Sequence, residues 1–114
     1  MKITTIGEIL LDMTQTHVEN HIPHFAAIPG GAPANVAVAA KKLGIESAFI
    51  GCVGDDLYGE LLRDTLLRYG VSAAGLQVTK KANTTLAIVM VDEHGERSFS
   101  FYRKPGADTL IDAE

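Results

Sequence analysis

A pair of glycines followed four residues later by an asparagine is the part of this sequence best suited to hold a small polar ligand. Gly30 and Gly31 carry no side chains, so a ligand can lie directly against the backbone. Asn35 falls in the first turn of a helix that Pro33 is expected to open, where free N–H groups and the helix dipole meet ligand oxygens. Its amide offers both a donor and an acceptor, so we expect a hydroxyl-bearing ligand here.

Asp12 is a second candidate, because a carboxylate at the end of a strand can accept hydrogen bonds from two hydroxyls. A first strand is predicted over 2–6, closed by Gly7, which would leave Asp12 at a sheet edge. The glycine pair alone also fits a tight turn, with Asn35 as a helix cap. The loop lacks the Lys-Ser/Thr of a Walker sequence and is not GxGxxG, so a phosphate-gripping loop is not expected.

Other polar clusters have simpler interpretations. His17, His21 and His24 could suit zinc, but they fall in a polar stretch with no Cys and no helix to align them, so we expect surface histidines and no metal site. Asp55 and Asp56 precede a helix and are expected to cap it, with Asp56 the better cap.

The elements that must position these residues alternate between strand and helix. Helices are predicted from Pro33 to Leu43 and over 57–69, around a nearly all-apolar strand at 47–53, with a short third strand near 76–79. This order predicts an α/β fold with a parallel sheet. The inner helix faces are expected to be Val36, Ala39, Ala40 and Leu43 in the first helix, and Leu57, Leu61, Leu62, Leu66 and Tyr69 in the second.

Two further segments are predicted to form a lid. Residues 14–28 form an excursion with possible short strands at 16–18 and 25–28. The stretches 86–91 and 97–103 form a hairpin around the turn at 92–95, and this hairpin is expected to be attached to the sheet. Period-two alternation puts Phe99, Phe101 and Arg103 on one face of its second arm, and Ser98, Ser100 and Tyr102 on the other. Such a face could cover a polar ligand or the same face of a second subunit, so a homodimer through the lid is a possibility.

Composition limits which partners and which cellular location are expected for this chain. The chain has 114 residues, enough for one globular domain, and a formal charge of −4, which argues against nucleic-acid or anionic-membrane partners. No stretch reaches membrane-spanning length, and Glu8 and Asp12 interrupt any signal-peptide core. The single Cys52 lies in a buried strand and cannot form an intrachain disulfide, so a cytoplasmic location is expected.

Taken together, these motifs resemble the PfkB, or ribokinase-like, carbohydrate kinase family over essentially the whole chain. The pattern also includes GDDLYG at 54–59, TTLAIVMVDEHGERSFSFYR at 84–103 and PGAD at 105–108. Its first signature corresponds here to Gly30, Gly31, Pro33, Asn35, Ala37, Gly44 and Gly54. The resemblance implies a ribokinase-like parallel βαβ sheet with an antiparallel β lid at about 14–28 and 86–103, and residues 1–114 would be the N-terminal portion of that domain.

The resemblance also implies an acceptor-sugar site between the sheet and the lid. Asp12, Gly30, Gly31 and Asn35 would hold the sugar hydroxyls, with Ala87, Phe99, Phe101 and Arg103 on or near the lid face. ATP and Mg²⁺ would bind in a C-terminal part that also carries the family's catalytic Asp in a GAGD-type motif. No such motif occurs here, Gly106-Ala107-Asp108 is expected to be a structural turn, and 112–114 looks like a helix start that is not completed.

Departures from the family pattern bear on the sugar. Ribokinases usually have Asn where this chain has Leu10 and Lys where it has Ala32, which makes ribose a poorer candidate. GEILLDM, GGAPANVAVAAKKLG and GERSFSFYR look most like bacterial fructokinases, which implies phosphorylation of the fructose 6-hydroxyl, with 2-keto-3-deoxygluconate kinase or another PfkB sugar kinase as the alternative. A different class remains open: a catalytically inactive sugar-binding or assembly module.

Overall fold

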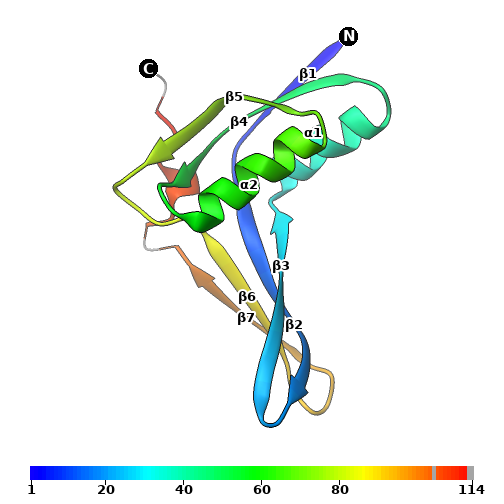
Figure 1. Ribbon diagram of the computed structural model, residues 1–114, viewed down its shortest axis with the longest axis vertical. Coiled ribbons are helices and arrows are strands. Elements are labelled where there is room, and N and C mark those ends of the chain that lie inside the picture. Colours follow the sequence, from blue (N-terminus) through cyan, green and yellow to red (C-terminus); the bar gives the residue numbers. More distant parts are fainter. Residues whose placement is uncertain (104, 113–114) are drawn as a thin grey trace.

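The protein is built from two sheets and two helices, described here from a computed structural model that covers residues 1–103 and 105–112. The first sheet is parallel, with strand order β1 (Lys2–Ile6), β4 (Glu46–Gly54) and β5 (Ser72–Thr79). Helices α1 (Ala32–Lys42) and α2 (Leu57–Arg68) lie beside it, and the second sheet extends away as a long arm (Figure 1). The predicted α/β architecture is therefore confirmed.

The second sheet, here called the lid, contains β2 (Leu10–Glu19), β3 (Ile22–Gly30), β6 (Leu86–Val91) and β7 (Arg97–Tyr102). Its order is β3-β2-β6-β7, and the central β2–β6 pair is parallel while the two outer pairs are antiparallel. The expected antiparallel lid is thus a mixed sheet. It is also separate from the parallel sheet, whereas the 86–103 hairpin was predicted to be attached to that sheet.

The β2–β3 hairpin is longer and more regular than the predicted excursion with two short strands. The sequence prediction underestimated it because prolines within a run argue against a strand, whereas Pro23 and Pro29 both lie on β3, which is an edge strand and tolerates them. The turn between the strands places Asn20 and His21 at positive φ, 53° and 63°. No helix aligns the histidines of this segment, as expected, but the paired strands bring His17 and His24 opposite one another.

The predicted helices are present, but their buried faces differ from the expectation. Val36 and Leu43 are 53% and 80% exposed, and so are Leu57 and Tyr69 at 80% and 43%, while Ala39 and Leu61 are also exposed. Ala40, Leu62 and Leu66 are buried as predicted, and Ala34, Ala37 and Gly59 are buried with them. The helices approach the sheet closely enough that these small residues must face it.

Two contacts show how close that approach is. The Ser47 hydroxyl of β4 donates a hydrogen bond to the Ala37 carbonyl at 2.8 Å, and Thr5 of β1 donates to the Pro33 carbonyl at 2.7 Å. In α2, a Cβ placed on Gly59 would lie 2.2 Å from the carbonyl oxygen of Gly54. Backbone-to-backbone packing of this kind excludes any larger residue at position 59.

The core lies where the parallel sheet, both helices and the base of the lid meet. Phe49 and Val53 of β4 and Leu62 of α2 are at most 1% exposed, and Leu11 of the lid is fully buried among them. Cys52 is buried and free, as predicted. Within residues 1–103 and 105–112, no helix is both long and apolar enough to cross a membrane. The helix start predicted at 112–114 falls mostly outside the described residues.

Candidate functional site

Asp12 lies within the lid and not at the end of the first strand, where the sequence placed it. After Gly7 the chain passes directly into β2, so Asp12 is the third residue of that strand. It pairs with Ala87 of β6, which in turn pairs with Phe101 of β7, while Ile28 flanks it on β3. Because residues paired across neighbouring strands share a face, Asp12, Ala87 and Phe101 form one row on one face of the lid.

Gly30 makes room for the Asp12 carboxylate. A Cβ at position 30 would lie 2.5 Å from Asp12 Oδ2, so the carboxylate rests directly against the backbone where β3 ends. Burial raises the pKa of Asp12, and the negative charge of Glu8 raises it further. A ligand that donates hydroxyl hydrogens to this carboxylate would therefore relieve an unfavourable environment.

Gly31 lies between Gly30, which contacts this carboxylate, and the start of α1. Its φ of 104° and the 2.6 Å that would separate a Cβ from the Glu8 carbonyl oxygen both demand glycine. Gly31 is the N-cap of α1, and its carbonyl accepts from the Asn35 N–H at 2.9 Å. Among the described residues no side chain caps α1, so the N–H groups of its first turn are available to a ligand, except at Pro33, which has no N–H.

The Asn35 side chain is exposed one turn into α1. Together with Gly30 and Pro29 it borders a small hollow of about 20 Å³ between α1 and α2, too small for a sugar. The structure therefore brings Asp12, Gly30 and Gly31 together, and it leaves the Asn35 amide on the surface beside them. Their role in holding a ligand stays a prediction.

Arg103 is bound by carboxylates of the protein itself. Its Nη2 lies 2.8 Å from Asp108 Oδ2 and 3.1 Å from Glu8 Oε2, and its guanidinium lies 5.6 Å from the centre of the Phe101 ring. Its Nε is buried and has no hydrogen-bond partner among the residues described. The sequence analysis missed Glu8 and Asp108 as partners of Arg103; Glu8 lies far away in the sequence, and only the fold brings it near.

The Gly106–Asp108 segment is a turn, as predicted, and it also buries a charge. A 3₁₀ turn spans Ala107–Thr109, and the Thr109 N–H donates to the Gly106 carbonyl at 3.1 Å. Asp108 is 6% exposed and accepts hydrogen bonds from the Thr85 hydroxyl and from Arg103. This carboxylate therefore holds the end of the lid against the core, which is a structural task.

The lid face that carries Asp12, Ala87 and Phe101 is open to solvent along β7. Phe99 lies one row beyond Phe101 on the same face, and the two side chains are 62% and 55% exposed, whereas Ala87 is 2% exposed. Two exposed aromatic rings on a sheet suit a cover over a ligand or a contact with another surface.

Asp56 caps α2, as predicted, and it does more than that. Its carboxylate accepts from the Gly59 N–H at 2.8 Å, from the Thr84 N–H at 2.9 Å and from the Thr84 hydroxyl at 2.7 Å. The Gly54 N–H donates to the same Thr84 hydroxyl at 2.9 Å. Burial would raise the pKa of Asp56, but the hydrogen bonds from Thr84, Gly59 and Tyr58 outweigh it and hold the pKa below its ordinary value.

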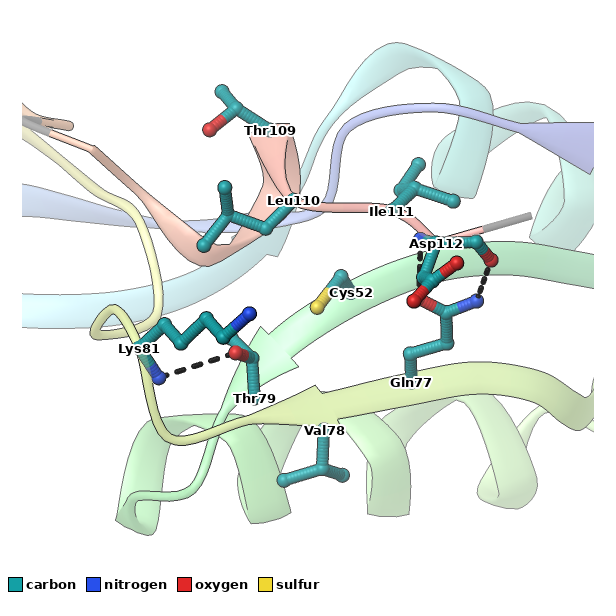
Figure 2. Close-up of a pocket in the computed structure, with 9 residues that line it drawn as sticks. All are labelled: Cys52, Gln77, Val78, Thr79, Lys81, Thr109, Leu110, Ile111 and Asp112. Carbon is teal, nitrogen blue, oxygen red and sulfur yellow. Dashed lines mark hydrogen bonds between the residues drawn. The ribbon is translucent and has the colours of Figure 1, made fainter. Parts of the chain in front are cut away.

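A larger cavity lies beside the carboxyl ends of β4 and β5, and the sequence analysis did not find it (Figure 2). Its volume is about 670 Å³, and one wall is the segment after Thr109, which Gln77 holds through both of its amide atoms to the backbone of Asp112. Among the described residues that line it, Lys81 is the one with a cationic side chain. Burial, with the charge of Asp108, raises the pKa of the Cys52 thiol, which makes Cys52 a poor nucleophile.

Comparison with known proteins identifies the family to which this fold and site correspond. The pfkB family carbohydrate kinase profile matches residues 1–113. Fructokinase-2 of Solanum lycopersicum is 46% identical over 112 residues, which are 96% of this chain and 34% of that protein. The chain thus spans about a third of the length of the curated relatives it matches.

Solved structures agree with this match. The fructokinase of Xylella fastidiosa with bound ATP has a TM-score of 0.89 at 44% identity, over 96% of this chain and 35% of that one. The fructokinase of Vibrio cholerae O395 in its form with fructose, ADP and calcium ion has a TM-score of 0.84 at 38% identity, over 97% and 35%. Shared sequence pattern, fold and lid lead to one conclusion: this chain belongs to the pfkB family of carbohydrate kinases.

Proposed function

We propose that this chain supplies the acceptor-sugar part of an ATP-dependent carbohydrate kinase that phosphorylates the 6-hydroxyl of fructose. The observation that carries the proposal is the position of the Asp12 carboxylate, against Gly30 and next to the uncapped start of α1. A carboxylate accepts hydrogen bonds and free helix N–H groups donate them, so the pair can grip neighbouring hydroxyls of one sugar. Fructose is supported by the similarity to fructokinases.

In this proposal Gly31 and Asn35 complete the floor of the sugar site, and the lid closes it. Ala87 is small and leaves room beside Asp12, while Phe99 and Phe101 shield the sugar from water. Arg103 acts by holding the lid end through Glu8 and Asp108, and its contact with the sugar is secondary. The sugar hydroxyl is thereby positioned, which is most of what phosphoryl transfer asks of an acceptor site.

We assign no catalytic base and no nucleotide site to these residues. Magnesium prefers carboxylates together with phosphate oxygens, and among the described residues the group with metal-ligand spacing contains two imidazoles, which do not fit it. We therefore place ATP and Mg²⁺, with the base, on parts of the kinase that residues 1–112 do not include. A similar protein has been solved with ATP bound.

Two attributes of the whole protein follow as proposals. The exposed Phe99 and Phe101 favour a homodimer in which the lid of one subunit meets the lid of the other. The single buried, free Cys52 favours the reducing cytoplasm.

The test is sugar binding measured by isothermal titration calorimetry across fructose, ribose and 2-keto-3-deoxygluconate, in the chain and in the longer reading frame if it continues past Glu114. Fructose should bind best. Asn35→Ala should weaken it by about 1 to 3 kcal/mol, because sugar hydroxyls lose their partner, and Asp12→Asn should weaken every accepted sugar. Asp64→Asn, an exposed carboxylate on α2, serves as the control.

Distinct results would redirect the proposal. Tighter binding of 2-keto-3-deoxygluconate would make that acid the substrate. Sugar binding without ATP-dependent phosphorylation in the longest expressed chain would indicate an inactive binding module. Unchanged fructose affinity in both Asp12→Asn and Asn35→Ala would remove these residues from the site.

A further inference from the structure

The tip of the β2–β3 hairpin carries a group of side chains that the sugar site does not use. His17 of β2 pairs directly across the strands with His24 of β3, and their rings are stacked with centroids 4.4 Å apart. Glu19 lies two residues beyond His17 and so shares its face. One ligand atom from each of His17, Glu19 and His24 lies within 4.8 Å of the others, and all three side chains are exposed.

A bulge in β2 arranges these groups. The register shifts between Gln15 and His17, so Thr16 is an extra residue without a partner on β3, and such bulges re-aim side chains. The Thr16 hydroxyl donates to the His24 carbonyl at 3.2 Å and lies 2.9 Å from His17 Nδ1. While its hydrogen is directed at the carbonyl, the hydroxyl can accept a hydrogen bond from a ring that carries its proton on Nδ1, so the contact is compatible with the Nδ1–H tautomer of His17.

In that tautomer His17 Nε2 carries a free lone pair, which a metal ligand needs. Nε2 lies 3.8 Å from Glu19 Oε2, so a cation between them could bind both atoms. Metal-binding histidines commonly donate their other ring nitrogen to an oxygen that fixes the tautomer, which is the task Thr16 performs here.

We propose that His17, Glu19 and His24 form a zinc site that clips β2 to β3 at the hairpin tip. Two imidazoles and one carboxylate suit Zn²⁺ and leave a fourth position to water. The two stacked rings must turn so that both lone pairs meet the ion, and exposed side chains rotate readily. The site is distinct from the sugar site, which lies at the opposite end of the same hairpin.

The test is titration of the chain with Zn²⁺ against a chromophoric indicator, with Mg²⁺ as a cation that the site should ignore. One zinc should bind per chain. Binding should be lost in the His17→Ala/His24→Ala double variant, and Thr16→Val should weaken it about tenfold, the effect expected of a second-layer partner. Zinc should also raise the melting temperature of the chain and leave that of the double variant unchanged.

Two control variants separate this site from binding by any exposed histidine. His21→Asn keeps a residue that tolerates the positive φ of the turn, and it should bind zinc as the unmodified chain does. His94→Ala removes an exposed histidine whose Nε2 also lies 3.8 Å from a glutamate, Glu93, but which has no second imidazole beside it. It too should leave zinc binding unchanged.

Equal loss in His21→Asn and the double variant would overturn the proposal, because it would mean a flexible loop holds the metal. Zinc binding by the double variant as tight as that of the unmodified chain would also overturn it. If a variant unfolds, NMR of the unmodified chain decides: zinc-dependent shifts should centre on His17, Glu19 and His24, and shifts centred elsewhere would rule the site out.

Discussion

The parallel sheet with its helices and the lid are built by opposite rules. In the first, packing is so close that a Cβ on Gly59 would meet the Gly54 carbonyl, and the Asp56 carboxylate accepts hydrogen bonds from Gly59 and Thr84. In the lid, Phe99 and Phe101 face solvent, and among the described residues none donates a hydrogen bond to the Asp12 carboxylate. The two carboxylates have opposite pKa shifts, which agrees with a structural task for Asp56 and with the ligand-binding role proposed for Asp12.

The largest effect is expected from Gly59→Ala, which tests how closely the helical layer packs. The new methyl group would meet the Gly54 backbone, so α2 must move away from β4 at a cost of about 3 kcal/mol. Urea denaturation followed by circular dichroism measures the change. Glu60→Ala, at the exposed neighbouring position of the same helix, should change stability little, and equal stability of both variants would show that the layer is looser than described.

Asp56→Asn should cost about 2 kcal/mol at neutral pH, since it weakens the α2 cap and the hold on Thr84. The folded pKa of Asp56 is lowered, so its contribution is fully present above the ordinary value of about 3.9 and is lost as the pH falls through the lower folded value. The gap between variant and unmodified chain should therefore close on acidification. A gap independent of pH would contradict this assignment.

Asp12→Asn should instead increase the stability of the fold at neutral pH. Because the folded pKa of Asp12 is raised, its ionised form opposes folding, and the variant should gain about 0.5 kcal/mol at neutral pH. That gain should vanish as the pH falls through the raised pKa towards the ordinary one. A thermal melt at several pH values checks it, and a loss of stability would make Asp12 a structural residue of the lid.

Phe99→Ser should have the smallest effect on folding, within about 0.5 kcal/mol, because the ring is mostly exposed. If the lids pair in a homodimer, sedimentation analysis of the same variant should show weaker association. Ser98→Ala, on the other face of β7, should leave association unchanged.

The division between these regions also explains what the sequence could predict. The βαβ order, the cap at Asp56 and β6 were predictable because local signals, such as apolar runs, an acid before a helix and terminal glycines, decide them. The buried helix faces were predicted only in part: Ala40, Leu62 and Leu66 follow the helical period, whereas Ala34, Ala37 and Gly59 face the sheet because the helices approach it closely.

The lid was harder because its pairing joins distant segments. Pro23 and Pro29 argued against a strand where β3 lies, because prolines are rare in strands other than edge strands. Nothing in the sequence near Asp12 indicates that it pairs with Ala87 across β2 and β6. The Arg103–Glu8 contact has the same character. Residue chemistry alone singled out Gly30, Gly31, Asn35 and Asp12 as ligand candidates, and the family pattern added Ala87 and the expectation of a sugar.

The parallel β2–β6 pairing sets an order of events for a chain that is made from its N-terminus. The β2–β3 hairpin emerges first, but the strand that completes it comes only after both helices, β4 and β5. Until then the inner edge of β2 exposes unpaired N–H and C=O groups that another chain could pair with. Closing this long-range contact is a slow step, so the nascent chain is most prone to aggregate while β6 is still being synthesised.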